Sequence, residues 1–132
     1  MFKRGMVAGR AGRRSTGFNK KDATHFRCSR LPIAVAHGEG YADFSQRGNV
    51  AQVQRAMRFV DHSGAATEAY PFNPNGSPGG LTAVTTPDGR FTALMPHPER
   101  VFRNVQMSWT SGDVAQRSPW TRMFANARRW VG

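Results

Sequence analysis

Short apolar runs alternate with turn-forming segments through most of this chain, a pattern typical of strands rather than of long helices. Residues 31–36 are apolar and end at a glycine-bounded turn, which predicts a buried strand. Residues 56–60 alternate between apolar and polar side chains and predict a half-exposed strand, with a turn at residues 61–64. Residues 80–86 and 90–95 flank Pro87-Asp88-Gly89 and therefore predict a hairpin.

Two other segments depart from this strand pattern. Residues 45–54 are polar and predict a turn with a short helix. Ser118-Pro119 is a helix-start signal, because a capping hydroxyl precedes a proline at the first helical position. The apolar residues that follow recur at helical spacing, so we expect this helix to pack against the sheet. Its apolar stripe is Trp120, Met123, Phe124, Ala127 and Val131, with Arg122, Asn126 and Arg129 on the other side.

Residues 71–80 contain three prolines, three glycines and two asparagines, so this segment must be a loop. The loop could be a simple connection. Its polar side chains, Asn73, Asn75 and Ser77, could instead bind a polar substrate or a neighbouring domain, and the sequence favours neither interpretation. His37 and Glu39, at the end of the first predicted strand, are further candidates for such contacts.

The length of 132 residues fits one small domain, and the net charge of +11 is unevenly distributed. Residues 1–30 hold nine basic residues and one acid, whereas the rest of the chain contributes only +3. We expect residues 1–27 to be a disordered basic tail, because they show no sustained apolar period. The tail could be a phosphate-binding arm, a transit peptide or a solvated leader. Since the basicity belongs to the tail, the sequence disfavours nucleic acid as a partner of the folded part.

Composition also limits the location and chemistry of the protein. No apolar run approaches the roughly 20 residues of a membrane span, so we expect a cytoplasmic protein without a membrane partner. The only cysteine, Cys28, excludes an internal disulfide and a multi-cysteine metal site, and we expect no metal site. Two neighbouring arginines could activate the Cys28 thiol. It lacks the glycine-flanked turn of a typical nucleophile, which favours an incidental thiol.

Candidate chemistry lies just after the second hairpin strand, in Met95-Pro-His-Pro-Glu-Arg100. The two prolines favour an extended backbone, in which His97 and Glu99 project to the same side and can meet. A histidine held by a carboxylate can accept a proton from a thiol or hydroxyl. The pair could also be only a surface ion pair.

Several motifs together resemble the C-terminal end of phosphoribosylformylglycinamidine synthase, of the large single-chain type. They are residues 31–40, Tyr70-Pro-Phe-Asn-Pro-Asn-Gly-Ser-Pro78, residues 80–86, Met95–Arg103, Ser118-Pro-Trp120 and Phe124-Ala-Asn-Ala-Arg128. The resemblance covers residues 28–132 and leaves residues 1–27 unmatched. It implies an α/β fold for residues 28–132, part of a class I glutamine amidotransferase (flavodoxin-like) domain that ends in a helix.

The resemblance also implies a chemistry. Such a domain hydrolyses glutamine through a Cys-His-Glu triad, and the ammonia passes to an ATP- and Mg²⁺-dependent synthase domain that forms formylglycinamidine ribonucleotide. His97 would be the general base and acid, and Glu99 its orienting partner. The nucleophilic cysteine of the family stands on an upstream elbow, so we expect no nucleophile and no cofactor in this chain. Its partners would be the synthase domain or an upstream amidotransferase piece. The alternative is a non-catalytic α/β module that its basic tail tethers to an anionic partner.

Overall fold

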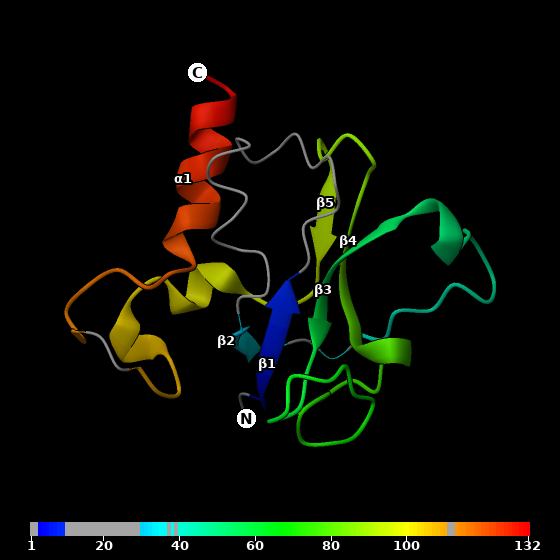
Figure 1. Ribbon diagram of the computed structural model, residues 1–132, viewed down its shortest axis with the longest axis horizontal. Coiled ribbons are helices and arrows are strands. Elements are labelled where there is room, and N and C mark those ends of the chain that lie inside the picture. Colours follow the sequence, from blue (N-terminus) through cyan, green and yellow to red (C-terminus); the bar gives the residue numbers. More distant parts are fainter. Residues whose placement is uncertain (1–2, 10–29, 37, 39, 111–112) are drawn as a thin grey trace.

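The computed structural model describes residues 3–9, 30–36, 38, 40–110 and 113–132, and these residues contain one five-stranded sheet and a C-terminal helix (Figure 1). The order of strands across the sheet is β2-β1-β3-β4-β5. The strands are β1 (Lys3–Gly9), β2 (Arg30–Val35), β3 (Gln54–Phe59), β4 (Leu81–Thr85) and β5 (Thr92–Leu94). The helices are α1 (Thr121–Trp130) and the short 3-10 helices η1 (Val50–Gln52), η2 (Pro78–Gly80), η3 (Pro98–Val101) and η4 (Asn104–Gln106).

The strands predicted from the apolar runs are confirmed as β2, β3, β4 and β5. All four pairings in the sheet are antiparallel, and the sheet together with the C-terminal helix confirms the expected α/β class. β4 and β5 pair antiparallel because the turn between them is short, whereas parallel neighbours need a long crossover connection. The described residues therefore form a small α/β unit whose sheet is antiparallel.

The prediction of a disordered tail over residues 1–27 was wrong for residues 3–9, which form β1. This strand lies between β2 and β3, with Lys3 opposite Val35 and Val7 opposite both Leu31 and Phe59. Backbone pairing with two neighbours satisfies the N–H and C=O groups of a strand whether or not its side chains alternate. The periodic spacing of apolar residues along the sequence could therefore not reveal β1. Residues 10–27 lie outside the described residues.

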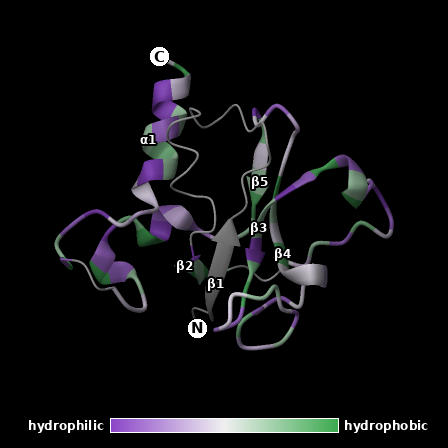
Figure 2. Ribbon diagram, in the orientation of Figure 1, coloured by the Kyte–Doolittle hydropathy of each residue, from purple (hydrophilic) through white to green (hydrophobic). Residues whose placement is uncertain are grey.

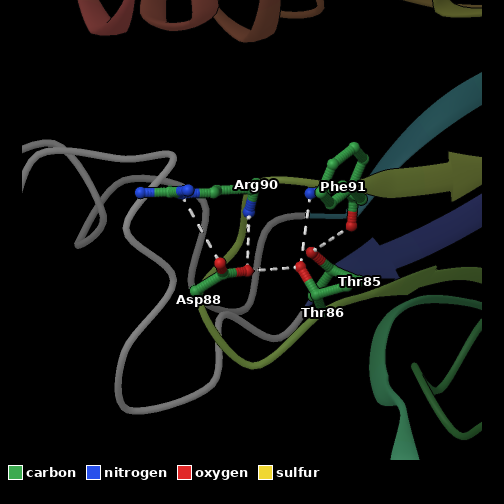
Figure 3. A network of polar contacts seen from close by, with 5 residues as sticks. All are labelled: Thr85, Thr86, Asp88, Arg90 and Phe91. Carbon is green, nitrogen blue, oxygen red and sulfur yellow. Dashed lines mark hydrogen bonds and ion pairs between the residues drawn. The ribbon is translucent and has the colours of Figure 1, made fainter.

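The hairpin of β4 and β5 is closed by a network of side-chain contacts (Figure 3). The Thr86 hydroxyl donates to the Asp88 carboxylate at 2.6 Å, and the Arg90 N–H donates to the same oxygen at 3.2 Å. The Thr85 hydroxyl donates to the carbonyl of Phe91 at 3.0 Å. The hydrogen bond from Thr86, followed by that from Arg90, holds the pKa of Asp88 below its ordinary value. The predicted turn is thus confirmed, together with the contacts that fix it.

The main core cluster joins buried residues that are far apart in the sequence, namely Ile33, Val35, Phe59, Val101 and Trp120. Trp120 also donates a hydrogen bond from its indole Nε1 to the carbonyl of Pro32 at 2.8 Å. The segment that precedes α1 is therefore bound to β2 by both apolar packing and a buried hydrogen bond.

Neither the start of α1 nor its packing face follows the prediction. The helix begins at Thr121 with Trp120 at its N-cap, two residues later than Ser118-Pro119 predicted. The Ser118 hydroxyl accepts a hydrogen bond from the N–H of Trp120 at 3.2 Å in the turn that precedes the helix. The inward side of the helix carries Trp120 and Asn126, both buried, whereas Phe124 is exposed. The prediction that Asn126 lies on the outer side was wrong, because only the first turn of the apolar stripe reaches the core. None of the described helices is long and apolar enough to span a membrane.

Candidate functional site

His97 lies three residues after the end of β5, in a segment held by the backbone of two other strands. Its N–H donates to the carbonyl of Ala34 in β2 at 3.0 Å. Two residues earlier, the N–H of Met95 donates to the carbonyl of Thr82 in β4 at 3.1 Å. These two bonds place His97 across the end of the sheet, next to β2. The backbone that carries the imidazole is thus bound on both sides by regular structure.

The side chains of His97 and Glu99 meet as predicted, with 2.8 Å between Nδ1 and Oε1. The route differs from the expected extended backbone, because Pro98 begins the 3-10 helix η3. His97 has φ −112° and ψ 81°, outside the helical region, and the tight turn after it brings residue 99 back toward the ring. Proline at the first position of η3 supports this turn.

The pair is accessible to solvent, with 27% of the His97 side chain and 55% of the Glu99 side chain exposed. Arg100 is a cationic neighbour of Glu99, with 3.8 Å between its Nε and the same Glu99 oxygen. Exposed ion pairs contribute little to stability, generally below about 1 kcal/mol. The geometry is, however, that of an imidazole oriented by a carboxylate through Nδ1, with Nε2 on the opposite side of the ring.

The loop candidates Asn73, Asn75 and Ser77 make their contacts within the chain. Ser77 is fully buried, and its hydroxyl donates to the carbonyl of Gly40 at 3.2 Å and accepts from the N–H of Ala42 at 3.1 Å. Asn73 is also buried, and its amide donates to the carbonyl of Ser77 at 3.0 Å. These contacts bind the loop to the segment that follows β2.

Asn75 connects this loop to the segment after β5 that carries His97. Its Nδ2 donates to the carbonyl of Gly40 and lies 3.9 Å from the sulfur of Met95. Three segments that are distant in the sequence therefore meet beside the His97 backbone. Sequence reasoning missed this junction, because each of its contacts joins segments that are far apart along the chain and carry no shared local pattern.

The remaining candidates, Cys28, His37 and Glu39, lie outside the described residues. Among the residues that the structure describes, no group of three or more His, Cys, Asp or Glu side chains could hold a metal ion. The candidate site of the described part is therefore the pair His97 and Glu99, with Arg100 beside it.

Comparison with known proteins connects this geometry to a family. The chain resembles PurLQS from Thermotoga maritima in structure, with a TM-score of 0.57 at 18% sequence identity. The alignment covers 100% of this chain and 48% of the PurLQS chain, so this chain spans about half the length of that structure. At this identity the likeness shows the fold alone. Residues 11–131 match the family of CobB/CobQ-like glutamine amidotransferase domains, and because this match includes most of the sequence, the chain belongs to that family.

Proposed function

We propose that this chain supplies the histidine and glutamate of a glutamine-hydrolysing site in an enzyme of the phosphoribosylformylglycinamidine synthase type. The observation that carries the proposal is the 2.8 Å contact between His97 Nδ1 and Glu99 Oε1, in a chain of the glutamine amidotransferase family. The resemblance of the sequence motifs to phosphoribosylformylglycinamidine synthase extends the proposal from membership of the family to one specific reaction. Ammonia from glutamine would convert formylglycinamide ribonucleotide to formylglycinamidine ribonucleotide in purine biosynthesis, in an ATP- and Mg²⁺-dependent synthase domain.

In the proposed reaction, Glu99 accepts a hydrogen bond from Nδ1–H of His97 and so presents Nε2 as the base. Nε2 takes the proton of a cysteine thiol, and the thiolate attacks the side-chain amide carbon of glutamine. The same proton then passes from Nε2 to the leaving nitrogen, which departs as ammonia. Nε2 next takes a proton from water, which attacks the γ-glutamyl thioester and releases glutamate and the thiol.

The thiol in this proposal comes from a cysteine-bearing segment, which we define as the part of such an amidotransferase domain that precedes the region matching residues 11–131. Cys28 is the only cysteine of the sequence and has no glycine beside it, unlike a nucleophile on a tight elbow. Without the thiolate no thioester forms, and the histidine and glutamate alone give little rate.

Ammonia release from glutamine tests the proposal. We expect almost none from the purified chain, and release when the cysteine-bearing segment is added. Under those conditions His97→Ala reduces the rate by about 10²- to 10⁴-fold, the usual contribution of a general base. His62→Ala is the matched control, because the His62 ring packs against Phe72, away from the pair.

Two results would contradict the proposal. Full activity of His97→Ala in the complemented sample would remove the histidine from the mechanism. Ammonia release from the chain alone, lost on Cys28→Ala, would show instead that Cys28 is the nucleophile.

A further inference from the structure

Asn75 and Ser77 attach the loop over residues 71–80 to the segment that follows β2. Figure 2 shows hydrophilic and hydrophobic residues intermixed along the segment between β3 and β4, and the main core cluster takes its residues from other parts of the described chain. Asn75 Nδ2 donates to the carbonyl of Gly40 and to the Ser77 hydroxyl oxygen, at 3.2 Å for the latter, and lies 3.9 Å from the sulfur of Met95. The attachment of the loop therefore depends on the amide group of Asn75.

Asn75 is also the one asparagine of the sequence that a glycine follows. In an Asn-Gly pair the backbone nitrogen of the glycine can attack the side-chain amide carbon of the asparagine, because no Cβ obstructs the approach and the glycine backbone rotates freely. The other asparagines precede lysine, valine, proline or alanine, whose side chains obstruct this attack. Proline in addition has no N–H to lose. Asn75 is therefore the position of this chain at which deamidation is intrinsically fastest.

The structure leaves the attacking nitrogen of Gly76 accessible. Gly76 is exposed with φ 68°, and a Cβ on it would meet nothing within 4 Å. Within the described chain, its N–H donates no hydrogen bond. On the other reacting group, Oδ1 of Asn75 is buried and accepts no hydrogen bond. The reacting amide is thus held in place through Nδ2 alone.

We propose that Asn75 is a deamidation site whose reaction rate is limited by opening of the loop, and whose product releases the loop from the segment after β2. The Gly76 backbone nitrogen loses its proton to hydroxide and attacks Cγ of Asn75. A bond forms between this nitrogen and Cγ, the bond from Cγ to Nδ2 breaks, and Nδ2 takes a proton from water and leaves as ammonia. Water then adds to one carbonyl of the resulting succinimide and opens the ring to aspartate or isoaspartate.

The hydrogen bonds of Nδ2 make this reaction depend on the fold. For the ring to close, Cγ must move onto the Gly76 nitrogen, and the contacts of Nδ2 with Gly40 and Ser77 oppose that movement. The reaction therefore proceeds from a locally open form, which is a minor population of the folded protein. Deamidation of Asn75 should consequently be slower in the folded chain than in the unfolded one.

The product cannot make the contacts of the original amide. A carboxylate oxygen in the place of Nδ2 is only an acceptor and would face the carbonyl oxygen of Gly40, which is also an acceptor. The Ser77 hydroxyl, which donates to Gly40 at 3.2 Å, has one proton and can satisfy only one of these two oxygens. Isoaspartate also lengthens the main chain by one carbon. Deamidation therefore detaches the loop at the junction beside the His97 backbone, and this inference does not depend on the proposed function.

Peptide mapping by mass spectrometry, after incubation of the full-length chain at mildly alkaline pH, tests the site. We expect aspartate and isoaspartate to form faster at Asn75 than at any other asparagine, and more slowly in the folded chain than in urea. Ser77→Ala should accelerate conversion in the folded chain by at least about fivefold, because it removes a buried hydrogen-bond partner, and should leave the rate in urea unchanged. Gly76→Ala should nearly stop conversion. Gly79→Ala is the matched control, because it has a similar positive φ of 59° and equally open space but does not follow an asparagine.

Hydrogen exchange tests the consequence of deamidation. Asn75→Asp should accelerate exchange of the Ala42 amide, which donates to the Ser77 hydroxyl at 3.1 Å, by at least about fivefold. Asn49→Asp is the control, since the Asn49 side chain only accepts a hydrogen bond from the N–H of Ala51, and a carboxylate accepts it equally well.

Four results would overturn the inference. Faster conversion at another asparagine, or an unmodified Asn75 in both the unaltered chain and Ser77→Ala, would exclude Asn75 as the site. Equal conversion rates in the folded and the urea-unfolded chain would exclude control by loop opening. Unchanged exchange at Ala42 in Asn75→Asp would show that the product does not release the loop.

Discussion

The indole Nε1 of Trp120 donates a 2.8 Å hydrogen bond to the carbonyl oxygen of Pro32, across 88 residues of sequence. Two residues further along β2, the carbonyl of Ala34 accepts the N–H of His97 at 3.0 Å. Carbonyls two residues apart point to the same edge of a strand, and β1 pairs along the other edge of β2. One strand edge therefore holds both the start of the C-terminal helix and the backbone of the candidate base.

Removing the indole N–H should destabilise the chain without opening a large cavity. In Trp120→Phe the buried Pro32 carbonyl loses its donor, which costs about 1–3 kcal/mol. Trp120→Ala also removes core packing and should cost about 3–5 kcal/mol. Urea denaturation measures both changes. Trp130→Phe is the control, because Trp130 is exposed and its replacement should change stability by less than about 0.5 kcal/mol. Equal denaturation midpoints for Trp120→Phe and the unmodified chain would mean that this hydrogen bond contributes nothing.

The features that the sequence predicted correctly depend on local physics. The Pro-Asp-Gly turn and its flanking β-rich runs lie within one short stretch, so the pattern itself specified the hairpin. The contact between His97 and Glu99 also needed only two neighbouring positions, although a 3-10 turn rather than an extended backbone makes it. The features that were missed depend on partners far along the chain. β1 is stabilised by two other strands, and the buried side of α1 was decided by where the first helical turn meets the core.

Ser77 joins the loop to the segment after β2, so its hydroxyl should be important for both. Its Oγ is fully buried between the N–H of Ala42 and the carbonyl of Gly40. Ser77→Ala leaves both backbone groups without this partner and should cost about 1–3 kcal/mol. Hydrogen exchange at the Ala42 amide should accelerate by more than the global change explains. Ser108→Ala, at an exposed serine, is the control. An unchanged Ala42 exchange rate in Ser77→Ala would contradict the contact.

Alanine substitutions at Gly79 and Gly80 distinguish the cost of backbone strain from the cost of a steric clash. Both glycines have positive φ, at 59° and 69°. A Cβ on Gly79 would meet nothing within 4 Å, so Gly79→Ala pays only for the left-handed conformation, about 1–2 kcal/mol. A Cβ on Gly80 would lie 2.6 Å from the carbonyl oxygen of Phe59. Gly80→Ala should therefore be clearly more destabilising in urea denaturation. Equal losses for the two variants would show that the close approach to β3 relaxes without cost.

Asp88 should make the hairpin turn sensitive to acid. Hydrogen bonds from the Thr86 hydroxyl and the Arg90 N–H hold its pKa below the ordinary value of 3.8 in the folded chain. A group whose pKa is lower in the folded state stabilises that state above the unfolded pKa, and this contribution is lost as the pH falls through the folded value. The amide NMR signals of Arg90 and Phe91 should therefore shift on acidification with a midpoint below 3.8. In Asp88→Asn the same signals should not follow this titration. The same acid-induced shift in both proteins would assign it to another group.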